Sequence, residues 1–383
     1  MGHQGLARTG FEVSGRERPA SSRRAPGPLA RRIDDVELDV DEYRVGMLIP
    51  MSGTAGIWGP SCLACATLAT EEWNAAGGVR GRRVNLTVID ASDESEALEA
   101  QIEQLIGDGA VESLVGMHTS SVRERVIGQL DGTLPFVYTP LYEGGAMPAG
   151  VMAIGETPRH QLLPAIDWLT RRYALRRWYM VGNDYCWPRR SHALAATALA
   201  KAGCEVVGSR YVPIGSCDVE QLVDDIRRSR AQAVLMSLVG QDAVDFSRAF
   251  GESGLARQAI RLSCAIEENG LLAIGPEHTE GLFVASGYFG SLDTDGNGAF
   301  RERYWSRFGE RAPVLNALGQ STYEGVAFLR GLLDHRQRDN GSVAFESVRA
   351  TRWRSNADKA MPIYLAQADG MRFRVIQTLE GSG

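Results

Sequence analysis

The sequence predicts an α/β protein with two lobes, each a doubly wound parallel sheet, joined by hinge crossovers. The chain has 383 residues, enough for two or three domains at ~150 residues each. Apolar runs of strand length alternate with amphipathic helical segments, a rhythm typical of right-handed crossovers and a parallel sheet. The rhythm restarts after the turn at residues 155–158, which indicates a second unit of the same kind.

The first unit begins at Tyr43. Apolar runs predict strands, and the 3.6-residue periodicity between them predicts helices. The expected strands are 44–50, 84–90, 113–116 and 135–138, and the expected helices are 60–76, 94–107 and 122–130.

The second unit repeats the pattern. Its expected elements are helix 159–172, strand 178–181, helix 188–202, strand 205–212, helix 219–229, strand 233–238 and helix 242–251. A strand at 282–287, helices at 299–308 and 321–335, a short helix and a strand pair at 362–367 and 372–378 complete the chain.

These elements predict a discontinuous domain organisation. We expect a leader at 1–43, a first lobe of 44–157 plus 283–337, a second lobe of 158–282 plus 338–378, and a tail at 379–383. Open α/β sheets bind ligands at the carboxyl ends of their strands, so the expected site is a cleft between the lobes.

Composition narrows the function classes. The formal charge of -6 disfavours direct nucleic-acid binding, and a run of ~18 apolar residues that could span a membrane is absent from the sequence. Six scattered cysteines are expected to be mostly free thiols. The chain has no G-x-S-x-G, Walker A or H-E-x-x-H motif, and its histidines are dispersed. We therefore expect no enzyme activity, no catalytic residues, no metal and no cofactor.

Two glycine-rich segments imitate known motifs. Gly53, Gly56 and Gly59 follow a strand, but their G-x-x-G-x-x-G spacing is not the dinucleotide fingerprint. Residues 293–298 match the first half of a calcium loop, whose twelfth position is Tyr304 instead of Glu. We expect Asp295 or Asn297 to cap the following helix instead.

Another short pattern, Cys62-x-x-Cys65, lies within a predicted helix. Because neither a second pair nor a His cluster accompanies it, we interpret these cysteines as buried apolar residues.

The leader, residues 1–43, is rich in Arg, Gly, Pro and Ser and ends in an acidic run, a composition typical of flexible segments. It lacks the apolar stretch of a secretory signal. The expected location is the cytoplasm, or the periplasm if the true start encodes a signal peptide.

Two motifs carry a family resemblance. VGMLIPMSG at 45–53 and EWNAAGGVRGR at 72–82 resemble the opening of type I periplasmic binding proteins of the leucine-binding-protein class. Within that class, VGNDYCWPR at 181–189 and YTPLYEG at 138–144 are similar to the AmiC-like branch of amide sensors and of urea and short-amide receptors. The resemblance spans roughly residues 44–378 and implies two lobes that close on a ligand.

By position, the resemblance implies a set of ligand contacts from both lobes. They are His118, Ser120, Tyr138 and Pro140 in the first lobe, and Tyr185, Trp187, Val239 and Glu267 in the second. The chemistry of several of these residues is consistent with ligand binding. Ser120 lies where a strand gives way to a helix, so its hydroxyl can meet a carbonyl or carboxylate. Aromatic residues can enclose a small ligand while offering OH and NH groups, although core packing is the alternative role for each.

Three positions bear on the ligand. Pro140 lacks the hydroxyl found in amide sensors, and Trp187 is larger than their tyrosine, which argues against acetamide itself. In amino-acid receptors an acidic residue near Glu267 holds the ligand ammonium. Stabilisation of a helix N-terminus is the alternative role for Glu267.

The expected function is a non-enzymatic receptor that closes on an amide, a urea-like compound or an amino acid. The main prediction is a cytoplasmic sensor acting through a regulatory protein in amide or nitrogen metabolism. The alternative is a substrate-binding protein that delivers the same ligands to an ABC permease. The resemblance also leaves a homodimer open.

Overall fold

The computed structural model describes residues 41–92, 97–335 and 343–379. Residues 1–40 of the predicted leader and 380–383 of the predicted tail lie outside this range. Glu42 and Tyr43, assigned to the leader by sequence, instead open the first strand.

The first lobe is built on a five-stranded parallel sheet in the order β2-β1-β3-β4-β5. Its strands are β1 Glu42–Ile49, β2 Arg83–Asp90, β3 Ser113–Gly116, β4 Phe136–Tyr138 and β5 Val151–Ala153. The apolar residues of β1 divide between two cores: Val45 and Met47 lie in one, Leu48 in the other. The sheet is therefore covered on both faces, as the uninterrupted apolar runs indicate.

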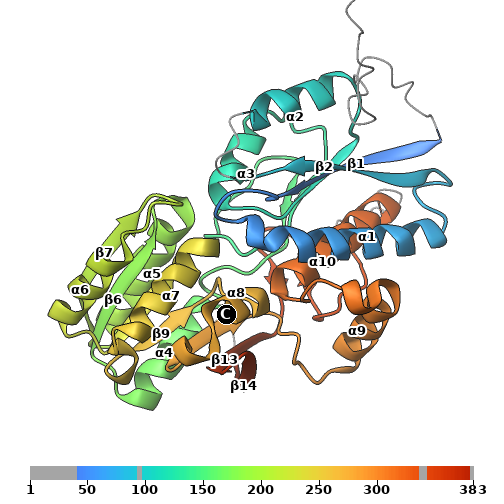
Figure 1. The fold of residues 1–383 in the computed structure, drawn as a ribbon. Coiled ribbons are helices and arrows are strands. Elements are labelled where there is room, and N and C mark those ends of the chain that lie inside the picture. Colours follow the sequence, from blue (N-terminus) through green and yellow to red (C-terminus); the bar gives the residue numbers. More distant parts are fainter. Residues whose placement is uncertain (1–40, 93–96, 336–342, 380–383) are drawn as a thin grey trace, which may run out of the picture. The chain divides into compact units, whose positions relative to one another are not determined.

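Helices complete each core of this lobe. α1 (Gly59–Ala75) and α10 (Ala317–His335), far apart in sequence, lie side by side on one face, with α9 (Asp295–Phe308) beside them (Figure 1). α2 (Leu98–Gly107) and α3 (Ser120–Ile127) cover the other face.

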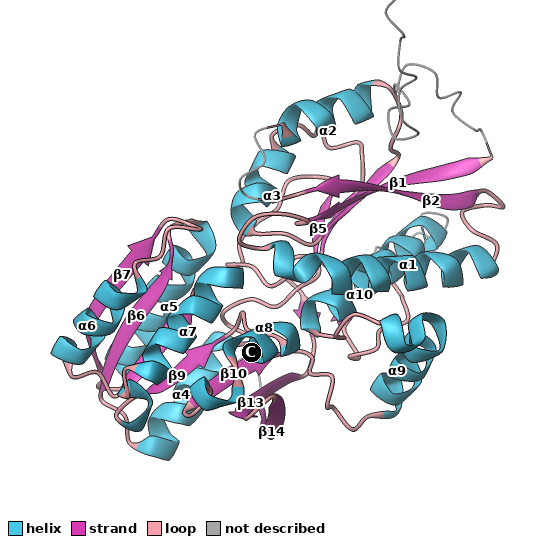
Figure 2. Ribbon diagram, in the orientation of Figure 1, coloured by secondary structure: helices cyan, strands magenta, loops and turns pink. Residues whose placement is uncertain are grey.

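The second lobe contains a seven-stranded sheet in the order β14-β13-β10-β9-β8-β6-β7. Figure 2 labels β6, β7, β9, β10, β13 and β14 of this sheet. Its strands are β6 Arg177–Asn183, β7 Glu205–Val212, β8 Ala233–Ser237, β9 Ile260–Ser263, β10 Leu282–Ser286, β13 Ile363–Asp369 and β14 Arg372–Leu379. The pairs from β7 to β10 are parallel, whereas β13 and β14 are antiparallel. The helices are α4 Leu162–Tyr173, α5 Cys186–Lys201, α6 Val219–Ser229, α7 Gly240–Glu252 and α8 Glu268–Ile274.

The described residues confirm the α/β class with two lobes and parallel sheets. They differ from the sequence expectation in detail. β5, β9 and α8 were not expected. Between residues 335 and 362, where a short helix was expected, the described residues 343–361 contain strands β11 (Arg352–Trp353) and β12 (Lys359–Ala360). The expected helix cap at Asp295 or Asn297 is wrong: Thr294 caps α9 by accepting the N–H of Asn297.

Two segments lie differently from the expected domain boundaries. β10 belongs to the second sheet, so the crossover expected at residue 283 comes after Ser286. Part of 338–378 packs on the first lobe, because Phe345 and Trp353 contact Phe328 of α10.

The chain passes between the lobes three times: after β5, after β10, and through the segment leading to β13. Glu156 of the first crossover links all three. Its Oε1 accepts the N–H of Gly287 (3.1 Å) and Nη1 of Arg349 (2.6 Å). Arg349 also donates through Nε to Glu324 of α10 at 3.1 Å. All three charged side chains are buried, which fixes the crossovers against one another.

Candidate functional site

A pocket opens at the carboxyl ends of strands from both sheets. All eight sequence-predicted contact residues line it: His118, Ser120, Tyr138, Pro140, Tyr185, Trp187, Val239 and Glu267. Trp58, Met117, Thr119, Leu141, Ala265 and Leu318 complete the wall. The pocket holds about 390 Å³ of empty space including its mouth, of which about 30 Å³ can accommodate the centre of a water molecule. This conformation is therefore narrow, with room for on the order of two waters.

The turn between β3 and α3 forms one wall. Thr119 is the N-cap of α3, accepting the N–H of Val122 at 3.4 Å, which aims the positive end of the helix at the pocket. Ser120 opens the helix and accepts Nη1 of Arg123 at 3.2 Å. Arg123 also donates to Glu143 at 2.7 Å, so a buried ion pair supports the serine from behind.

His118 is fully buried beside Ser120. Its ring stacks on Phe136 and lies against Tyr138, and its Nδ1 donates to the Thr119 carbonyl at 3.1 Å. A Cβ on Gly116 would meet its Nε2 at 2.5 Å, so only glycine in β3 leaves space for the ring. Burial lowers the pKa of His118 to about 3, and the imidazole is therefore neutral.

Tyr138, the last residue of β4, combines the two roles that the sequence left open, ligand contact and core packing. Its hydroxyl donates to the His118 carbonyl at 2.8 Å and its ring carries the Arg123 guanidinium at 5.1 Å. The side chain is fully buried. Tyr138 thus supports the wall while also lining the pocket.

The second lobe contributes two adjoining turns. Tyr185 and Trp187 follow β6, with ring centroids 6.3 Å apart. Asn183 fixes this turn to the next one, because its Oδ1 accepts the N–H of Val239 at 2.9 Å and its Nδ2 donates to Asp242 at 2.6 Å. The aromatic pair and the Val239 corner therefore form one supported wall.

Glu267 closes the pocket from the turn after β9. Burial, reinforced by the neighbouring Glu268 carboxyl, raises the pKa of Glu267 to about 8. The Trp58 indole opposes this rise, although within the described residues Trp58 Nε1 has no acceptor in good hydrogen-bonding geometry. Glu267 is also the N-cap of α8, but its side chain makes no capping hydrogen bond. Side-chain capping of α8 is therefore not the role of this carboxyl.

Sequence reasoning missed Trp58 and Arg123. Trp58 lies five residues beyond the motif at 45–53, in the glycine-containing loop before α1, where nothing in the sequence pattern marks a ligand contact. Arg123 is an arginine on a helix, a residue type that is mostly exposed, and only its buried partner Glu143 reveals its role.

The two lobes touch around the pocket. The Thr54 carbonyl accepts the N–H of Gln241 at 3.0 Å, and Asn269 Nδ2 donates to the Ile57 carbonyl at 2.9 Å. At another point Arg190 of α5 reaches Glu143 of the first lobe at 3.1 Å. These contacts hold the walls close together.

Glu143 also belongs to a group of potential metal ligands with Glu124 and Cys186, whose donor atoms lie within 4.8 Å of one another. Arg123 and Arg190 already pair with Glu143. Burial and the adjacent carboxylates raise the pKa of Cys186 to about 12, so the thiol is not the thiolate that metals prefer. The group is better described as an ion-pair cluster.

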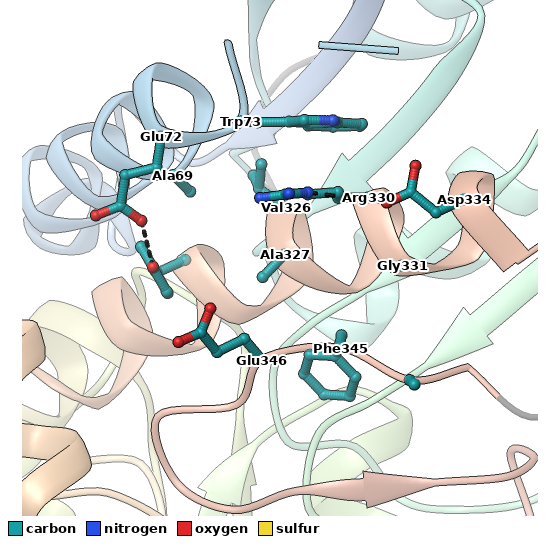
Figure 3. Close-up of a pocket in the computed structure, with 12 residues that line it drawn as sticks. Ala69, Glu72, Trp73, Val326, Ala327, Arg330, Gly331, Asp334, Phe345 and Glu346 are labelled. Carbon is teal, nitrogen blue, oxygen red and sulfur yellow. Dashed lines mark hydrogen bonds and ion pairs between the residues drawn. The ribbon is translucent and has the colours of Figure 1, made fainter. Parts of the chain in front are cut away.

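A separate hollow lies between α1, α10 and residues 344–346 of the first lobe (Figure 3). None of the sequence-predicted contact residues lines it. Four of its charged or polar side chains are already paired, Glu72 with Arg303 and the Tyr323 hydroxyl and Arg330 with Asp334, which leaves Glu346 as a single carboxylate at the edge. It therefore lacks the converging, available polar groups of a ligand site.

The chain matches the model of a protein family described as "Periplasmic binding protein" over residues 42–368, and it belongs to that family. A relative, Leu/Ile/Val-binding protein homolog 7 of Brucella abortus, is 24% identical over 237 residues, which cover 57% of this chain and 58% of the relative. The match thus spans somewhat more than half the length of that relative.

Solved structures show the same fold. A periplasmic binding protein from Burkholderia mallei is similar with a TM-score of 0.78 at 16% identity, covering 90% of this chain and 96% of that one. An ABC transporter solute-binding protein from R. palustris, in complex with 4-hydroxybenzoate, is similar with a TM-score of 0.74 at 16% identity, covering 89% of this chain and 97% of that one.

None of the described helices has the length and apolar character needed to cross a bilayer.

Proposed function

We propose that this chain is a non-enzymatic solute-binding protein that captures a small amino acid or aromatic acid between its lobes for an ABC transporter. The observation that carries the proposal is the pocket itself. One wall presents a hydroxyl at a helix N-terminus, and the other presents aromatic rings and a buried carboxyl. The names of the Brucella and R. palustris proteins support this class of ligand.

The two walls have complementary roles. Ser120 and the N-terminus of α3 favour a ligand carboxylate or carbonyl, since helix N-termini attract negative charge. Tyr185 and Trp187 offer flat apolar faces to the body of the ligand. Glu267 can take a ligand ammonium when ionised or donate to a ligand oxygen when protonated. The narrow space requires the walls to part for entry, so binding involves opening and reclosing.

The pH dependence of binding separates the two ligand classes. A ligand ammonium prefers ionised Glu267, so affinity rises between pH 6 and pH 9 as the carboxyl loses its proton near pH 8. A ligand oxygen that accepts from protonated Glu267 shows the opposite trend. Titration calorimetry in two buffers of different ionisation enthalpy would also detect the proton released with an ammonium ligand.

The direct test is a thermal-shift screen over amino acids, benzoates, short amides and ureas, followed by calorimetry on the strongest hit. A ligand at about 100 times its Kd raises the free energy of unfolding by about 2.7 kcal/mol. We expect Ser120→Ala and Trp187→Ala each to weaken that hit by about tenfold or more, corresponding to at least ~1.4 kcal/mol.

Asp218→Ala, which changes a helix cap in the second lobe and touches none of the pocket residues, is the matched control and should bind normally. Unchanged affinity in both pocket variants would refute the site, and a screen without any hit would refute the function.

The cytoplasmic amide sensor remains a prediction from sequence resemblance. The relatives described above are named as amino-acid-binding or transporter-associated proteins, so they favour the transport alternative. A strongest response to short amides, together with binding to a regulatory protein, would return the sensor role to first place.

A further inference from the structure

A second, inner chamber adjoins the ligand pocket. The two share Leu141, Ala265, Glu267 and Leu318 as lining residues, so they meet at Glu267. The lining residues found only in the chamber are Glu156, Gln161, Cys264, Ile266, Ser286, Ala317, Ser321 and Arg349. The chamber thus extends from the pocket to the hinge network that joins the three crossovers.

Arg349 is the key group of this chamber. Its side chain is 2% exposed. Nη1 donates to Glu156 and Nε donates to Glu324. Within the described residues Nη2 has no hydrogen-bond partner. A buried guanidinium N–H without an acceptor is costly, so an oxygen atom from outside the protein is the expected occupant.

The charge of the network limits what that oxygen belongs to. Glu156 and Glu324 are two carboxylates on one guanidinium. Lys359 interacts electrostatically with Glu156, but burial lowers its pKa to about 7, so near neutral pH its charge offsets the negative excess only in part. Glu324 is already satisfied by Gln320, Ser347, Thr351 and Arg349. An anionic ligand group added here would face two buried carboxylates, which repel it at low effective dielectric. A neutral acceptor avoids that repulsion.

The small volume of the chamber also favours a single neutral oxygen. About 20 Å³ of the chamber can accommodate the centre of a water molecule, which is room for on the order of one water. A single hydroxyl or carbonyl oxygen can replace such a water, whereas a larger group cannot enter without displacing the hinge.

We infer that the ligand of the proposed pocket carries a neutral oxygen acceptor at the end remote from Ser120, and that this oxygen passes Glu267 and accepts from Arg349. The inference rests on the proposed function and deepens it. It assigns selectivity for amide, hydroxyl or phenol groups over apolar and anionic ones. A site built to donate to an oxygen rejects an analogue that lacks it, because the donor is then left unpaired.

The test uses ligands matched in shape. L-leucine, L-asparagine and L-aspartate have side chains of similar branched shape. The tip of the side chain is apolar in leucine, neutral and polar in asparagine, and anionic in aspartate. Benzoate, 4-hydroxybenzoate and terephthalate form a parallel aromatic series. We expect the affinity of asparagine or 4-hydroxybenzoate to be at least about tenfold higher than that of the other members of its series, as measured by calorimetry on the whole chain.

Two variants locate the effect. Ala317→Val narrows the chamber without changing a residue that lines the outer pocket, and Arg349→Lys keeps the charge but removes the guanidinium fork. Both should reduce the preference within a series. Ala317→Val should also leave the apolar member's affinity within about twofold, because it changes neither the outer pocket nor the hinge ion pairs. Asp218→Ala should leave affinities and preferences unchanged.

The outcomes are distinct. If no ligand of either series binds, both the proposed function and this inference fall. If ligands bind with equal affinity across a series, or the anionic member binds best, the inference alone falls and a buried water satisfies Arg349. A neutral-oxygen preference that survives both variants also overturns it, because the oxygen must then lie elsewhere.

Discussion

Glu267 shows how one buried carboxyl links binding to stability. Its pKa is raised to about 8 in the folded protein, from an ordinary value of 4.5, mainly by burial. Between pH 4.5 and 8 the folded state therefore keeps a proton on Glu267 that the unfolded state has already released. Stability from this group is complete below pH 4.5 and is lost as the pH rises through 8.

We expect Glu267→Gln to be nearly as stable as the parent at pH 5 and more stable at pH 9, because glutamine never acquires the buried charge. In a chain of this size each kcal/mol changes Tm by roughly 2 °C, so a difference of several degrees should appear by calorimetric melting at pH 9. Glu103→Gln, at an exposed position of α2, is the control. Parallel pH profiles for Glu267→Gln and the parent would show that Glu267 is already ionised near neutrality.

At this scale the sequence predicted pocket residues wherever a strand ends. Ser120, Tyr185 and Glu267 follow strands, Tyr138 is the last residue of one, and all four line the pocket. Arg349 could not be predicted, because its partner Glu156 lies 193 residues away. Sequence distance carries no information about which buried charges meet in three dimensions.

Among the elements, α6 best illustrates local coding. Its range Val219–Ser229 is the one expected from periodicity. The Asp218 side chain accepts the N–H of Gln221 at 3.0 Å, and Arg230 ends the helix in the left-handed region. Short-range rules are therefore sufficient to place this helix.

We expect Asp218→Ala to lower the free energy of unfolding by about 1 kcal/mol, the usual contribution of an N-cap. Urea denaturation would measure it. Asp218→Asn, which preserves a capping oxygen, should recover most of the loss, and failure of that recovery would mean that the cap is not the cause.

The elements that were missed are short or unusual in composition. β5 has three residues and α8 has seven, too few to display a period. β9 carries Arg261, whose guanidinium is buried and donates to the carbonyls of Ser247, His278 and Glu280. A charged residue in a four-residue strand conceals the apolar pattern, and only tertiary contacts reveal how it is satisfied.

At the scale of the whole molecule, Arg190 connects the lobes. Its side chain is 60% exposed, whereas its partner Glu143 is buried and already paired with Arg123. Partly exposed ion pairs contribute at most about 1 kcal/mol. The Arg190–Glu143 contact should therefore stabilise the closed arrangement of the lobes slightly without being essential to it.

We expect Arg190→Ala to weaken ligand binding by about two- to fivefold, with a smaller salt dependence than in the parent. Arg171→Ala, which removes a pair confined to α4, should leave affinity unchanged. Identical affinities for Arg190→Ala and the parent at low salt would show that the contact does not favour closure.

The three crossovers also have a consequence for the gene. Because each lobe is assembled from separated stretches of the chain, no single cut in the coding sequence yields one complete lobe. Exchanging a lobe between relatives would require several junctions at once, all compatible with the carboxylate of Glu156. Descent with gradual change of the pocket lining is thus a simpler route to a new specificity than recombination of halves.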